Sequence, residues 1–152
     1  MVPQMKQVIA VNAVSATAAG TVTSAVIDTL GFDYASIDVW ATTQSASTQA
    51  GSPSVLKLQE ADNTSATSFV DIVGFRGASA TATNVDFVVP IGVTSGINNY
   101  KFNVDCRSRK RYLSLVVSPT TSQTVYASVN LARGEQSPST AAKAGVLALI
   151  EG

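Results

Sequence analysis

Four of the ten cations in this 152-residue chain lie within five consecutive residues and form its densest group of potential anion-binding side chains. The four are Arg107, Arg109, Lys110 and Arg111. In an extended segment the three arginines share one face and Lys110 points to the other. Guanidinium groups bind phosphates and carboxylates through paired hydrogen bonds. Their partner is therefore a nucleic acid, the carboxylates of another protein, or carboxylates elsewhere in this same chain. Within the fold, the candidate carboxylates are Asp105, Asp86 and Glu60.

The charge balance bears on the first of these partners. Ten Lys and Arg residues are offset by ten Asp and Glu residues, so the net charge is zero. Such a chain lacks the broad positive field that drives non-specific nucleic-acid binding. Tyr112 is the only aromatic residue beside the basic run that bases could stack on. We therefore expect no nucleic-acid partner.

Histidine is absent and cysteine occurs once, which removes much catalytic chemistry. Ser-His-Asp and Cys-His nucleophiles and histidine metal sites are excluded. Cys106 falls on the apolar side of an expected strand and is predicted to be a buried, unreactive thiol. Asp28, Asp33 and Asp38 recur every five residues but lack the alternating oxygens of a calcium loop. We expect neither a cofactor nor a metal ion.

The most enzyme-like motif is residues 26–31, Val-Ile-Asp-Thr-Leu-Gly. It resembles the apolar-apolar-Asp-Thr-Gly motif of retroviral-type aspartic proteases, in which two carboxylates share a proton across a dimer. Here Leu30 separates Thr29 from Gly31, so the tight turn of those enzymes is not encoded. An Asp-Thr pair that ends a strand before a glycine turn is the simpler interpretation.

The elements that must position these residues are strands. Charged residues make up 13% of the chain, against about 25% in a typical soluble domain. Apolar residues alternate with polar ones, most clearly from Tyr100 to Cys106. Trp40 and Tyr34 belong to the core or anchor an interface. The expected strands are residues 6–11, 22–28, 35–41, 55–60, 69–74, 85–90, 100–106, 113–118 and 124–131. Ser, Thr, Gly and Asn clusters, including 42–54, 77–84 and 92–99, are expected to be loops.

About nine strands spaced 10 to 15 residues apart predict an all-β fold, an antiparallel β-sandwich of jelly-roll type. We expect one domain over residues 1–136, followed by a C-terminal tail or short helix over 137–152. Pro138, Ser139 and Thr140 precede a segment with apolar residues at helical spacing. The segment must be covered either by its own sheet or by a neighbouring subunit.

No segment has the 18 or more apolar residues of a membrane span, so we expect no membrane partner. Residues 6–11 fit an N-terminal strand better than a signal peptide, because Asn12 interrupts a short apolar core and Lys6 is the only charge before it.

Several segments recur in the same order in a known group of proteins. They are residues 28–34, 37–39, 55–60 with Asp62, 71–75, 100–105, 107–113 and 132–136 with Pro138. This ordered set resembles the capsid decoration, or cement, proteins of tailed bacteriophages. The resemblance spans residues 21–145.

The resemblance implies a jelly-roll structural protein, without catalytic activity, that forms a homotrimer and binds the major capsid protein. Its location would be the outer surface of the virion capsid, after synthesis in the host cytoplasm. It favours subunit or capsid contacts at the basic run and at the C-terminal segment. The expected contact residues are Arg107, Arg109, Lys110, Arg111, Val146, Leu149 and Ile150.

Two other functions remain open from the sequence. One is a tail-associated or fibre-associated β domain that makes a structural, receptor or glycan contact; exposed loop aromatics would favour it, and the loops contain almost none. The other is a dimeric aspartic protease that uses Asp28.

Overall fold

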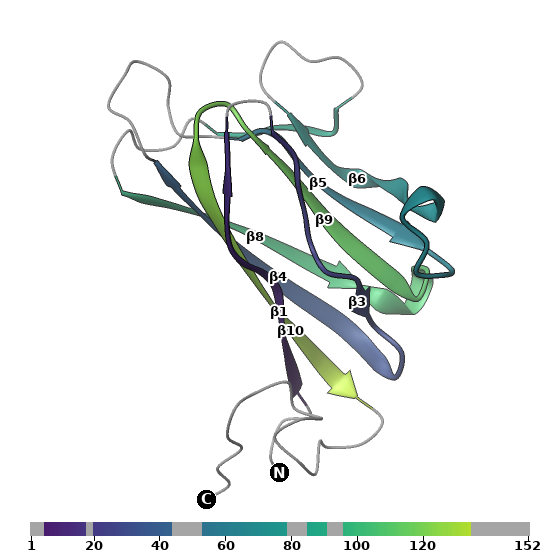
Figure 1. The fold of residues 1–152 in the computed structure, drawn as a ribbon. Helices are drawn as coiled ribbons and strands as arrows, with labels where there is room; N and C mark the ends of the chain where they lie inside the picture. The colour runs from purple at the N-terminus through teal and green to yellow at the C-terminus, as the bar shows by residue number, and fades with distance from the viewer. Residues whose placement is uncertain (1–4, 18–19, 44–52, 79–84, 91–95, 135–152) are drawn as a thin grey trace, which may run out of the picture.

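The computed structural model describes residues 5–17, 20–43, 53–78, 85–90 and 96–134, which form an all-β sandwich of two sheets (Figure 1). Sheet A contains four antiparallel strands in the order β1-β10-β4-β8. These strands are β1 (Met5–Ala16), β10 (Gln123–Gly134), β4 (Phe32–Thr43) and β8 (Ile97–Asp105). The N-terminal strand therefore pairs with the last described strand.

Sheet B has the order β2-β9-β5-β6-β7, and β3 pairs with β9 beside β2. Its pairs are antiparallel except β6 with β7, which is parallel. The strands are β2 (Val22–Thr23), β3 (Ile27–Asp28), β5 (Pro53–Ala61), β6 (Val70–Ala78), β7 (Phe87–Val88) and β9 (Tyr112–Pro119). Two short 3₁₀ turns, η1 (Ala66–Ser68) and η2 (Cys106–Ser108), lie in the connections.

The period-two pattern explains the core. In β8, Phe102 and Val104 are buried while Lys101 and Asn103 are exposed, as the alternation predicts. Both inner faces contribute aliphatic side chains to one core cluster, including Ile37 and Val129 from sheet A and Leu58 and Leu115 from sheet B. The expected all-β sandwich is confirmed.

The expected single strand over residues 22–28 is wrong, because the structure has β2 and β3 with a break between them. At the break, the backbone N–H of Ser24 donates to the Leu115 carbonyl (2.9 Å), while its hydroxyl oxygen accepts from the Leu115 N–H (2.9 Å). The next residue, Ala25, donates its N–H to the Ala10 carbonyl of β1 (2.8 Å). The serine side chain thus replaces a backbone carbonyl of the ladder and lets the chain bend toward sheet A.

Three other expectations differ from the structure or lie outside it. Residues 85–90 contain only the two-residue strand β7, and the expected loop over 92–99 overlaps β8, which begins at Ile97. The expected tail or helix over 137–152, with Val146, Leu149 and Ile150, lies outside the described residues. Within the described part, no helix is long and apolar enough to cross a membrane.

Candidate interaction surface

The basic run forms the connection between β8 and β9, where the chain passes from sheet A to sheet B. Arg107 lies in the turn η2, so the run is not an extended strand and its arginines do not share one face. Arg107 pairs with Asp105, and its guanidinium carbon lies 5.1 Å from the Tyr34 ring centroid on β4. The guanidinium carbon of Arg109 lies 5.9 Å from the ring centroid of Phe75 on β6. The arginines therefore diverge around one end of the sandwich.

Arg111 points to β3, where it holds Asp28 through two hydrogen bonds of 2.8 and 2.7 Å. Lys110 pairs with Asp62 (3.1 Å), and its backbone N–H donates to the Glu60 carboxylate (3.2 Å). The expected internal partners are thus confirmed for Asp105 and in part for Glu60. They are wrong for Asp86, which pairs with Arg76 instead.

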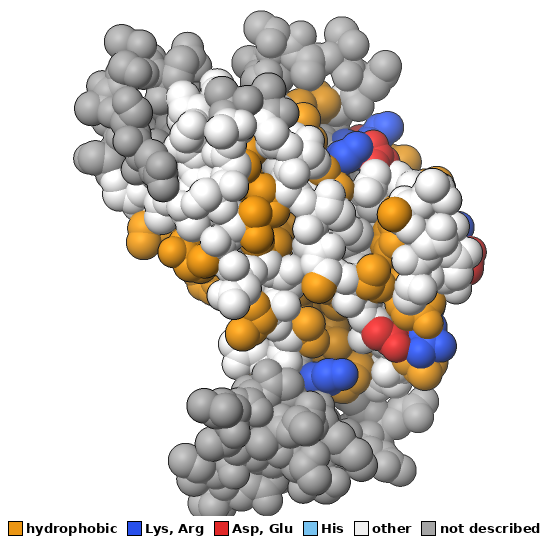
Figure 2. Space-filling model, in the orientation of Figure 1, with side chains coloured by type: hydrophobic (Ala, Val, Ile, Leu, Met, Phe, Trp, Pro, Cys, Tyr) orange, Lys and Arg blue, Asp and Glu red, His pale blue; other side chains and the backbone are white. Residues whose placement is uncertain are grey.

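Every aspartate of the chain lies in a described ion pair. Among the described cations, Lys6 and Arg109 are in no ion pair. Figure 2 accordingly shows a face that is largely uncharged or hydrophobic, with Lys, Arg, Asp and Glu mostly in small mixed groups. Partners with strong net charge would find little unpaired charge on the described surface.

Asp28 and Thr29 connect the end of β3 to the start of β9 through hydrogen bonds to Arg111. The Thr29 hydroxyl and backbone N–H both donate to the Arg111 carbonyl, at 2.7 and 3.0 Å. The Arg111 guanidinium, hydrogen-bonded to the carboxylate, holds the pKa of Asp28 below its ordinary value. A catalytic aspartate pair needs one carboxyl with a raised pKa, which this environment opposes.

Cys106 is buried, as the strand pattern predicts, although it lies in η2 rather than in the strand itself. Its Sγ donates to the Val104 carbonyl at 3.8 Å. Burial raises the pKa of the thiol to about 11, so little reactive thiolate forms at neutral pH.

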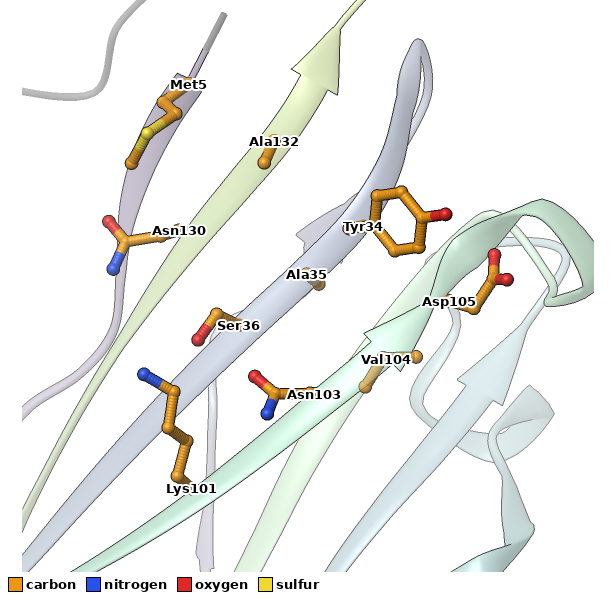
Figure 3. Close-up of a pocket in the computed structure, with 10 residues that line it drawn as sticks. All are labelled: Met5, Tyr34, Ala35, Ser36, Lys101, Asn103, Val104, Asp105, Asn130 and Ala132. Atoms are coloured by element: carbon orange, nitrogen blue, oxygen red, sulfur yellow. The ribbon is translucent and has the colours of Figure 1, made fainter. Parts of the chain in front are cut away.

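The outer face of sheet A carries two depressions. The first, the polar hollow, has a volume of about 640 Å³ and lies toward the ends of β1 and β10 marked by Met5 and Ala132 (Figure 3). Ser36, Lys101, Asn103 and Asn130 project from three strands on the same side of the sheet. Tyr34 lies at its rim, with the Arg107 and Arg133 guanidinium carbons 5.1 and 5.5 Å from its ring centroid.

The second depression, the apolar groove, has a volume of about 390 Å³. Its large apolar side chains come from all four strands of sheet A: Ile9, Tyr126, Trp40 and Ile97. Ile9 is 61% exposed, Ile97 62% and Tyr126 40%. Tyr126 lies directly opposite Trp40 in the β10–β4 register. Exposed apolar and aromatic side chains gathered in one place are typical of the centre of a protein interface.

The groove was only partly visible in the sequence. Alternation in β4 places Ile37, Val39 and Ala41 inward, so Trp40 must face outward, and the structure places it there. Ile9 is harder to assign, because the register of β1 shifts between Ile9 and Val11. That bulge turns both Ala10 and Val11 inward, so the alternation that places Ile9 in solvent breaks one residue later.

Acid is expected to weaken the fold. The Arg76 guanidinium lowers the pKa of Asp86, helped by N–H donors from Arg76 and Gly74; the Arg107 guanidinium lowers that of Asp105 to about 2. A carboxylate whose pKa in the folded state lies below its unfolded value of about 4 stabilises the fold. This stabilisation is complete above about pH 4 and is lost as the pH falls toward the folded pKa. The free energy of unfolding should therefore decline from about pH 5 to pH 2, as measured by urea denaturation. Asp86→Asn should decline less, and an equal decline in both proteins would contradict the assignment.

Comparison with models of protein families finds no match for this chain, and comparison with curated proteins finds none either.

Proposed function

We propose that this chain is a structural virion protein, a decoration protein that binds and stabilises the outer surface of a tailed-phage head as a homotrimer. The structural observation that carries the proposal is the outer face of sheet A, where the apolar groove lies on a rigid sandwich whose aspartates are already paired. Such a surface is suited to large protein contacts, since covering it removes few charges from water. The sequence resemblance supplies the phage assignment.

The jelly-roll assignment belongs to the same proposal, and the strand order supports it. Counted with β2 and β3 as one interrupted strand and without the short β7, the described residues form eight strands. The first then pairs with the eighth, the second with the seventh, the third with the sixth and the fourth with the fifth. A long antiparallel hairpin rolled into two four-stranded sheets has this pairing, which is the order of a jelly roll.

The other two candidate functions have less support. An aspartic protease would need the Asp28 carboxyl free to share a proton, and Arg111 occupies both of its oxygens. A glycan-binding tail domain would present exposed aromatic side chains on its loops, whereas the aromatic pair of the apolar groove, Trp40 and Tyr126, lies on the strands β4 and β10.

Binding to heads tests the proposal. The purified full-length chain is mixed with empty expanded heads of the virus that encodes it, sedimented, and imaged by electron microscopy. We expect saturable binding, extra density on the outer head surface and a higher temperature of head disruption, because three linked sites dissociate together only rarely. Absence of binding to heads, or density confined to the tail, would overturn the proposal.

A further inference from the structure

The apolar groove needs an occupant in the assembled protein. It crosses the whole width of sheet A, from Ile9 on β1 to Ile97 on β8, and its neighbours on the sheet are mainly neutral. The nearest ion pair on this face, Lys101 with Asp38 (3.4 Å), is satisfied within the sheet. An apolar segment with little charge would therefore fit the groove.

The chain itself contains such a segment. Residues 135–152 follow β10, lie outside the described part, and include five consecutive apolar residues from Val146 to Ile150. Between residues 141 and 150, Lys143 is the only charged residue. We propose that this C-terminal segment docks into the apolar groove of a second copy of the chain.

The direction of β10 favours a second copy over the chain's own groove. The strand passes the groove at Tyr126 and ends at Gly134, about 27 Å farther on at roughly 3.4 Å per residue. The polar hollow, which Asn130 and Ala132 line, lies between the groove and that end. A segment that folded back would have to reverse and cross this polar surface.

The reach of the segment is sufficient for exchange between copies. Val146 lies twelve residues beyond Gly134, which allows a span of up to about 40 Å. If every copy donates its segment to the next, the contact joins two different surfaces, and in the proposed homotrimer three such contacts close into a ring. This inference rests on the proposed homotrimer and assigns one of its contacts, but its test needs no phage heads.

Cysteine cross-linking tests the exchange. The native Cys106 should not form competing disulfides, because it is buried and the pKa of its thiol is raised. One full-length variant carries Ile97→Cys and the other Leu149→Cys; they are mixed, allowed to exchange subunits and oxidised mildly. We expect a disulfide-linked dimer on a non-reducing denaturing gel. The matched control pairs Leu149→Cys with Val73→Cys, an exposed position on sheet B, and should give no more dimer than either variant alone.

A double variant carrying both Ile97→Cys and Leu149→Cys separates the possible occupants. Covalent oligomers support exchange between copies, whereas a faster-migrating monomer means that the segment folds onto its own groove and overturns the proposal. Absence of either product means that another partner covers the groove and also overturns it.

A second measurement does not depend on disulfides. Leu149→Asp, outside the described sandwich, should weaken self-association at least tenfold in sedimentation equilibrium, and Ile97→Asp should match it. Unchanged association in both variants would overturn the docking. Retained binding to heads in that case would leave the proposed function standing, so the two failures can be told apart.

Discussion

Replacing Leu58 by alanine is expected to lower the free energy of unfolding by about 2–5 kcal/mol. Leu58 is fully buried on β5, opposite Leu115 on β9, and belongs to the cluster shared by both sheets. The substitution removes three carbons from this core and leaves a cavity that the rigid strands cannot close completely. Urea denaturation followed by circular dichroism gives the difference directly.

The chain offers a matched control for this prediction. Leu30 carries the same side chain but is 65% exposed after β3, so Leu30→Ala should change stability by no more than about 0.5 kcal/mol. Similar losses of stability in the two variants would mean that the core does not lie between the two sheets.

The position of Leu58 also illustrates what the sequence reveals reliably. A side-chain period of two separates inward from outward residues within each strand, and this local rule predicts the buried apolar residues of β8 and β10 correctly. In β9 it identifies Leu113, Leu115 and Val117 but misses Ser114 and Val116, which are also buried. The rule failed at residues 22–28, because the Ser24 hydroxyl there takes the place of a backbone carbonyl. Nothing in the local pattern distinguishes such a serine from an ordinary surface one.

The interaction surface depends on contacts that no local rule contains. Arg111 meets Asp28, 83 positions earlier in the chain, only because β3 and β9 are paired. Likewise, Ile9, Trp40, Ile97 and Tyr126 form one groove because four strands from distant parts of the chain are neighbours in sheet A. Each of these residues alone resembles an ordinary strand residue, and their strand order was not predictable from the sequence.

Arg109 is the residue of the basic run whose replacement should most affect binding to heads. Its guanidinium is in no ion pair among the described residues, whereas Arg107, Lys110 and Arg111 are each held by an aspartate. A partner carboxylate would therefore meet Arg109 without first breaking an internal pair. Under the proposed function, Arg109→Glu should weaken head binding at least tenfold, since like charges then face each other across the contact.

Two controls separate this effect from a general change in charge or stability. Thr23→Glu places a negative charge on β2, away from the basic run, and should bind nearly as the wild type does. Arg109→Lys keeps the charge but lacks the planar fork, so it should bind between the wild type and Arg109→Glu. Urea denaturation should give similar stabilities for all three, because Arg109 lies at the surface and its contact with Phe75 is a single ring interaction.

The salt dependence of binding then distinguishes a direct ion pair from a packing role for Arg109. A charge pair at the contact weakens as salt is added, because the Debye length shortens from about 14 Å at 50 mM NaCl to about 4 Å at 500 mM. The affinity of the wild type for heads should therefore fall over this range. The affinity of Arg109→Gln should fall less steeply over the same range, because its charge is gone. Equal slopes for the two proteins would mean that Arg109 contributes contact area rather than charge, and the basic run would then contribute no ion pair to the head surface through this residue.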